Sequence, residues 1–139
     1  MKRYSIPALL LLLLLGQTLA STENRLSDIQ VVLQKYIDGT ATGQPALVSE
    51  AFLPSLEVQY LGEGDRLLRR TGPDYIRRIE PGKVEPRFGR IVSIDATEKS
   101  AMAKVEIEWH DRLYTDYMLL LKVEGQWRIA NKVATWIKR

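Results

Sequence analysis

The chain has 139 residues, which suits a single domain, and it carries 20 Lys and Arg residues against 17 Asp and Glu residues. Without Lys2 and Arg3, 18 basic residues face 17 acidic ones, so no basic stripe for nucleic-acid binding remains. Cysteine is absent and histidine occurs once, which excludes disulfides, zinc held by thiolates and a site built from several histidines. We therefore expect no metal and no cofactor.

The first twenty residues have the layout of a secretory signal. Two basic residues stand at the start, an apolar run covers residues 6–15, and small residues follow at 18–20. The apolar run is shorter than the roughly 20 residues that span a bilayer. We predict a signal peptide over residues 1–20, export to the periplasm or medium without stable membrane insertion after cleavage, and one domain over residues 21–139. An uncleaved anchor is the alternative.

Three helices are expected before the C-terminal third of the chain. The first begins with the capping-box pattern Ser27-x-x-Gln30, continues with apolar residues at helical spacing, and is expected to end at Gly39. Pro45 suits the first turn of the second helix, and Thr71 can cap the third. The predicted helices cover residues 27–39, 45–51 and 73–79, and short strands are expected at 56–61 and 66–70.

The C-terminal third alternates β-branched and aromatic residues with short polar turns, one of which contains Gly125. This pattern predicts four successive antiparallel strands at 88–96, 101–109, 113–123 and 126–137. Helices followed by such a meander define an α+β domain. We predict a cone-shaped fold, in which a strongly curved antiparallel sheet, made of the four-stranded meander and the short strands, is covered on its concave face by about three N-terminal helices.

Several strings add a resemblance to a known family. They are Tyr-Ile-Asp-Gly-Thr-Ala-Thr-Gly at 36–43, Gly-Arg-Ile-Val-Ser-Ile-Asp at 89–95, Thr-Asp-Tyr at 115–117, Gly-Gln-Trp-Arg-Ile at 125–129 and Asn-Lys-Val at 131–133. With the element order, they resemble the nuclear-transport-factor-2-like superfamily of cone folds (SnoaL-like), and within it the group of putative lumazine-binding proteins. The resemblance implies a scaffold that hosts isomerases, dehydratases, hydrolases and plain binding modules, and that often forms dimers.

The orientation of Asp116 decides whether the cavity holds a carboxylate. With three-residue connections between strands, Tyr117 and Leu121 face inward and Asp116 lies outside, where Lys104 or Lys132 can reach it. With two-residue connections, Asp116 points into the cavity beside Val105 and becomes a candidate general base or acid. The burial of Tyr117 and Leu121 favours the first register.

Aromatic side chains with polar tips describe a pocket for a flat, partly polar molecule. The predicted ligand-binding residues are Tyr36, Tyr60, Tyr75, Trp109, Tyr117 and Asn131. We therefore predict an exported, non-catalytic protein that binds an aromatic or hydrophobic ligand. The alternative is a SnoaL-type isomerase, dehydratase or hydrolase with Asp116 or Asp38 as general base. In a third interpretation the aromatic side chains fill the cone themselves.

A further apolar set is expected on the outer face of the sheet. Met118, Leu120, Ala134 and Trp136 alternate with the side chains assigned to the inside. An exposed apolar patch of this kind usually marks association. We therefore predict a symmetric homodimer through these residues.

Overall fold

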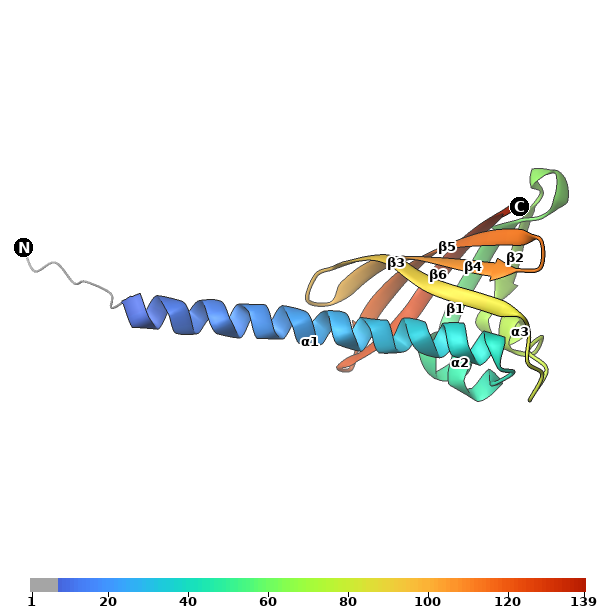
Figure 1. Cartoon of the computed structure of the whole chain (residues 1–139). Helices are drawn as coiled ribbons and strands as arrows, with labels where there is room; N and C mark the ends of the chain where they lie inside the picture. Colours follow the sequence, from blue (N-terminus) through green and yellow to red (C-terminus); the bar gives the residue numbers. More distant parts are fainter. Residues whose placement is uncertain (1–7) are drawn as a thin grey trace, which may run out of the picture.

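The computed structural model describes residues 8–139, with side chains described from residue 16 onward. Helix α1 (Ala8–Ala41) is continuous, and its N-terminal part projects beyond the rest of the molecule (Figure 1). The predicted start at Ser27 is wrong, because residues 17–38 contain no glycine or proline that would interrupt a helix. The charged start of the predicted signal lies outside the described residues.

The end of α1 also differs from the prediction. Gly39 lies inside the helix, where an added Cβ would come within 2.6 Å of Val48 Cγ2, so this glycine allows α1 to pack closely on helix α2 (Pro45–Ala51). The left-handed residue is Gly43, with φ of 67°. The predicted bounds of α2 are confirmed.

The third helix is shorter than expected but capped as predicted. Helix α3 (Gly72–Ile76) ends three residues before Ile79. The Thr71 hydroxyl accepts a hydrogen bond from the Asp74 backbone N–H at 3.2 Å, which satisfies one of the free amides at the helix start. This cap fixes the start of α3 and so the position of Tyr75.

Six strands form one curved, unclosed sheet. Its strands are β1 (Phe52–Leu61), β2 (Leu67–Thr71), β3 (Arg87–Ala96), β4 (Ser100–Trp109), β5 (Arg112–Val123) and β6 (Gln126–Lys138), with a single 3₁₀ turn, η1 (Glu63–Asp65), between β1 and β2. The spatial order is β2-β1-β6-β5-β4-β3. The four predicted strands of the meander are confirmed within one residue at each end. The sheet is mixed, because β1 and β6 run parallel.

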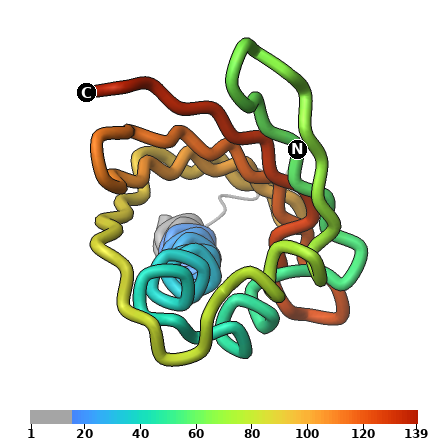
Figure 2. The backbone as a smooth tube through the Cα atoms, turned by 90° about the vertical axis from the view of Figure 1, so that its right-hand side faces the viewer, coloured from blue at the N-terminus to red at the C-terminus, as the bar shows by residue number. Residues whose placement is uncertain are grey.

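The sheet arches over α1, which lies along its concave side (Figure 2). Gly89 marks the closest approach, since a Cβ there would come within 2.5 Å of Ile37 Cγ2. The α+β cone that the sequence predicts is therefore confirmed. Among the residues that the structure describes, no helix is both long and apolar enough to cross a membrane.

Two features of the meander set which side chains point inward. The turns between β4 and β5 and between β5 and β6 have two residues each, with positive φ at His110, Glu124 and Gly125. In β6 the pairing skips Ala130, which forms a bulge. The bulge reverses the alternation, so that Val133 faces outward although Trp127 and Ile129 face inward as expected.

The predicted dimer residues lie on the other side of the sheet. Met118 and Leu120 are fully buried, Ala134 is 8% exposed, and Trp136 is half-buried. The prediction that these four side chains form the outer face is wrong, because the two-residue turn and the bulge shift both strands by one position. The outer face does carry exposed apolar side chains, among them Met102, Tyr117, Leu119, Leu121 and Val133. We call these five residues the outer patch.

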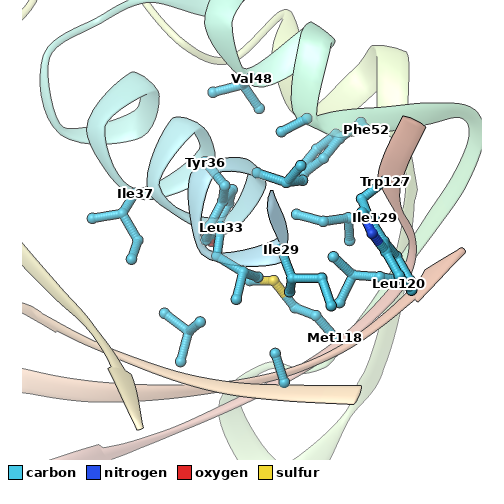
Figure 3. Packing of buried hydrophobic residues seen from close by; sticks show 14 of the residues in the cluster. Ile29, Leu33, Tyr36, Ile37, Val48, Phe52, Met118, Leu120, Trp127 and Ile129 are labelled. Atoms are coloured by element: carbon cyan, nitrogen blue, oxygen red, sulfur yellow. The ribbon is translucent and has the colours of Figure 1, made fainter. Parts of the chain in front are cut away.

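The core lies at the narrow end of the cone. Ile29 and Leu33 of α1 face Met118 and Leu120 of β5, and Trp127 closes the same end (Figure 3). Burial of each aliphatic side chain contributes roughly 1.5–3 kcal/mol, so this end holds the fold together. Its apolar side chains leave the opposite, wider end free for other chemistry.

Candidate functional site

Four polar side chains meet where the apolar core ends. The Tyr36 hydroxyl donates a hydrogen bond to Asp116 Oδ2 at 2.7 Å. Lys132 Nζ donates to the same carboxylate oxygen at 3.0 Å and to the Tyr36 oxygen at 2.7 Å. Because the proton of Tyr36 is directed at Asp116, the Tyr75 hydroxyl is the donor in its 3.2 Å contact with Tyr36. We call these four residues the floor network.

The register of β5 brings Asp116 inside. The two-residue turn His110-Asp111 pairs Asp116 with Val105, so the carboxylate is 2% exposed, and Tyr117 is 49% exposed on the outer face. The favoured prediction, Asp116 outside and Tyr117 inside, is therefore wrong. His110 adopts positive φ without being glycine, which hides the short turn from sequence inspection.

The bulge in β6 brings Lys132 to the same place. Sequence alternation put Lys132 outside, as a surface partner of Asp116. The pair forms, but with both side chains buried, at 5% and 2% exposed. A buried pair behaves differently from a surface pair, because removal of one partner leaves an uncompensated charge in the interior.

Tyr36 joins the core to the network. Its ring stacks on Phe52 with centroids 5.9 Å apart, and the Lys132 ammonium lies 4.8 Å from its centroid. Burial, followed by the negative charge of Asp116, raises the pKa of Tyr36 well above its usual value. This tyrosine therefore stays protonated as a donor to Asp116.

Tyr75 has the opposite electrostatic balance. Burial acts to raise its pKa, but the positive charges of Lys132 and Arg87 outweigh burial and lower the pKa. Tyr75 is therefore the more acidic hydroxyl of the floor network. It lines the cavity, where it can meet a bound molecule.

A cavity of about 650 Å³ opens above the floor network, at the wide end of the cone. This volume lies within the range of small-molecule sites. Its walls come from the β1–β2 hairpin, α3 and the residues after it, the start of β3, and the ends of β4, β5 and β6 that are remote from the core. The aromatic lining residues are Tyr36, Tyr60, Tyr75, Trp109, Tyr114 and Trp136.

Three arginines of the cavity lie on aromatic rings. Measured from the guanidinium carbon to the ring centroid, the pairs are Arg70 on Tyr60 at 4.8 Å, Arg87 on Trp109 at 5.3 Å and Arg112 on Trp136 at 3.9 Å. Contact with a ring face restrains a guanidinium while leaving its N–H edge available. A cluster of three or more side chains able to hold a metal is absent from the described residues.

Of the six predicted ligand-binding residues, four line the cavity, namely Tyr36, Tyr60, Tyr75 and Trp109. Tyr117 does not line the cavity, because it faces outward. Asn131 does not line it either, because it pairs across the strands with Leu119, which also faces outward. Asp38 is also remote, since it is exposed on α1 and accepts a hydrogen bond from Gln34 Nε2 at 2.8 Å.

Sequence reasoning missed the cations of the site. Lys132 and Arg87 alternate with apolar residues, as surface charges on a half-buried strand also do. Trp136 lines the cavity instead of the predicted outer face, because the bulge at Ala130 shifts this part of β6 by one residue. The two-residue alternative at His110, which the sequence left open, was the one signal that led to Asp116.

Comparison with known proteins identifies the scaffold. The model of a family described as putative lumazine-binding matches residues 24–134. No curated protein matches the chain.

Several solved structures share the fold. An NTF2-like protein of unknown function from Silicibacter pomeroyi DSS-3 is 23% identical, with a TM-score of 0.74 over 85% of this chain and 98% of that one. One from Methylobacillus flagellatus KT, also of unknown function, is 28% identical, with a TM-score of 0.73 over 82% and 93%. A structure titled putative scytalone dehydratase from Novosphingobium aromaticivorans DSM 12444 is 16% identical, with a TM-score of 0.66 over 86% and 91%.

Proposed function

The chain belongs to the putative lumazine-binding family, and from this premise we propose that it binds an aromatic or hydrophobic small molecule in its cavity without transforming it. The observation that carries the proposal is the 650 Å³ cavity with six aromatic side chains in its walls. Rings of this number provide flat apolar contact, and their hydroxyl and indole groups provide polar contacts at the edges.

The floor network supports binding over turnover. Asp116 Oδ2 already accepts hydrogen bonds from Tyr36 and Lys132, and the charge of the carboxylate is balanced by the ammonium 3.0 Å away. A general base needs a carboxylate that is free to approach a substrate proton. In the binding function that we propose, Asp116 is instead the acceptor at the centre of the floor network.

Native mass spectrometry of the protein purified gently from its own host tests the proposal. A constant extra mass is expected on the wild-type protein, and Trp109→Ala should lower its occupancy because the variant removes a cavity wall. Tyr117→Ala is the matched control, since it removes an aromatic side chain from the outer face. Equal loss of the extra mass in both variants, or its absence from the wild type, would contradict the proposal.

A second candidate function is an isomerase, dehydratase or hydrolase that uses Asp116 as general base. It is favoured by the inward orientation of Asp116, beside the acidic hydroxyl of Tyr75. The test is deuterium exchange at the α-carbon of 2-tetralone in D₂O, followed by proton NMR. Exchange above background that disappears in Asp116→Asn would establish the catalytic function and overturn the non-catalytic one.

We also propose export through cleavage after Ala20. The side chains of residues 16–24 are exposed, and Ile29 is the first buried residue of α1 among those whose side chains are described, so cleavage would remove none of the described core. Intact mass measurement of the protein recovered from the periplasm or medium should give a chain that starts at Ser21. An intact Met1 start would contradict cleavage and favour an anchor.

The outer patch supports a homodimer, with different residues from those the sequence predicted. Leu119 of β5 pairs with Met102 of β4, and Tyr117 lies two residues before Leu119 on the same face of β5. Each of the three side chains is about half exposed. Leu119→Asp should convert a dimer to a monomer in light scattering. Val84→Asp, on an exposed loop side chain, is the control and should leave the mass unchanged. A wild-type monomer would contradict the dimer.

A further inference from the structure

Four arginines line the cavity without a carboxylate partner. Arg70, Arg78, Arg87 and Arg112 all contribute to its wall. None of them forms an ion pair within the part of the chain whose side chains are described, whereas their neighbours Arg69 and Arg77 pair with Glu57 and Asp74. All four arginines that line the cavity therefore lack an ion pair with a described residue.

The remaining charges of the wall do not balance them. Asp116 is neutralised within the floor network by Lys132, which leaves Glu63 as the other acidic side chain in the lining. Four guanidinium groups thus face one free carboxylate across a cavity with low-dielectric aromatic walls. Such a concave surface concentrates a positive potential.

Arg70 and Arg87 are half-buried, whereas Arg78 and Arg112 are exposed. The Nε of Arg87 is shielded from solvent and has no hydrogen-bond acceptor among the described residues. Because that nitrogen is shielded from the cavity as well, the acidic group of a ligand would bind the terminal N–H groups of the guanidinium rather than Nε. Burial opposes the charged form, but Tyr36, Tyr75 and Asp116 raise the pKa of Arg87, so the guanidinium keeps its charge.

We infer that the ligand of the cavity is an organic anion, in which a flat ring lies between the aromatic walls and an acidic group binds the guanidinium of Arg87. The inference rests on the proposed binding function and narrows its ligand class. The planar fork of a guanidinium matches a carboxylate, and the Trp109 ring restrains Arg87 from one side. Arg112, restrained on Trp136, supplies a second cation nearer the solvent.

The test compares two probes of nearly the same shape, 2-naphthoate and its neutral carboxamide, by isothermal titration calorimetry with the mature protein. The carboxylate should bind at least about tenfold more tightly, because its hydrogen bonds with Arg87 are charge-assisted. Arg87→Gln should remove most of this preference. Arg112→Gln should reduce it by a smaller factor, and this exposed position carries little risk to folding.

Arg90→Gln is the matched control, because Arg90 lies on the same strand but pairs with Glu106 outside the cavity lining. It should retain the wild-type preference. Thermal unfolding of each variant verifies that it is folded. The assignment of an anionic ligand group to Arg87 would be overturned by either of two results. One is that Arg90→Gln loses as much of the carboxylate preference as Arg87→Gln does, and the other is that the preference is unchanged in both Arg87→Gln and Arg112→Gln.

Two outcomes separate this inference from the proposed function. If both probes bind equally well, the anion is excluded while a ring-binding cavity stands. If neither probe binds at about 1 mM, the limit of weak specific affinity, the anionic class is overturned, and the mass spectrum of the native protein then decides on binding itself.

Discussion

The two ends of the cone are built from the same strands and the same helix, yet their chemistry is opposite. At the narrow end Leu120, Met118 and Ile129 are buried with Leu33 in an apolar core. Asp116 lies two residues before Met118, on the same face of β5. From Asp116 toward the wide end, the inner surface carries charges and hydroxyl groups. The cavity lies at this wide, more polar end.

The boundary between the two ends is a single level of the cone. Tyr36 stacks on Phe52 of the core with its ring and binds Asp116 with its hydroxyl. Lys132, on β6, donates hydrogen bonds to the Tyr36 oxygen and to Asp116 Oδ2. The residues that stabilise the fold and those of the proposed binding site are therefore separated along one axis of the cone, so a substitution should affect mainly stability or mainly binding according to its level.

The largest effect is expected at the boundary. Lys132→Met should lower the free energy of unfolding by about 3–5 kcal/mol, because Asp116 is left buried without its counter-ion. The double variant Asp116→Leu/Lys132→Met should recover much of this loss, since no isolated charge remains. Urea unfolding at neutral pH measures both. A double variant no more stable than the single one would show that the pair matters for reasons other than charge.

A smaller loss is expected within the core. Leu120→Ala should cost about 2–5 kcal/mol, because it leaves a cavity beside Met118 and Ile129. Leu119→Ala, one residue away on the outer face, should change stability by less than about 0.5 kcal/mol in the monomer. A loss that varies with protein concentration would belong to the proposed dimer. Similar losses in both variants would contradict the assigned faces.

The same strand shows what the sequence could and could not predict. The bounds of β5 follow from polar turns on either side of a β-branched and aromatic run, and they are confirmed. Its faces depend on the number of residues in the turn at His110, and Tyr114 to Leu121 offers apolar residues on both sides. The local sequence pattern therefore predicts the bounds of β5. Its register depends on the positive φ of His110 in the turn, which the pattern does not indicate.

The site was less predictable than the fold for a related reason. Tyr36, Tyr60, Tyr75 and Trp109 could be predicted because aromatic side chains with polar tips are typical of a pocket for a flat, partly polar molecule. Lys132 required the bulge at Ala130, and a bulge needs no particular residue in the sequence. The arginines were missed because an unpaired arginine and a paired one look the same until their neighbours are known.

The smallest effect is expected on the pH at which the two tyrosines of the floor network, Tyr75 and Tyr36, lose their protons. Tyr75 has a lowered pKa and Tyr36 a raised one, so in the folded protein Tyr75 should ionise below pH 10 and Tyr36 well above it. The absorbance of tyrosinate at about 295 nm should therefore begin to rise below pH 10, and Tyr75→Phe should remove one tyrosine's share of this early rise. An unchanged early rise in Tyr75→Phe would contradict the assignment.

The sign of the stability effect distinguishes the two tyrosines. The raised pKa of Tyr36 gives a contribution that is complete below the unfolded value of about 10 and is lost as the pH rises through the folded value. The lowered pKa of Tyr75 gives a contribution that is present above pH 10 and is lost as the pH falls through its folded value. Urea unfolding between pH 8 and pH 11 should therefore show a steeper alkaline loss in Tyr75→Phe than in the wild type, because only the Tyr36 effect remains.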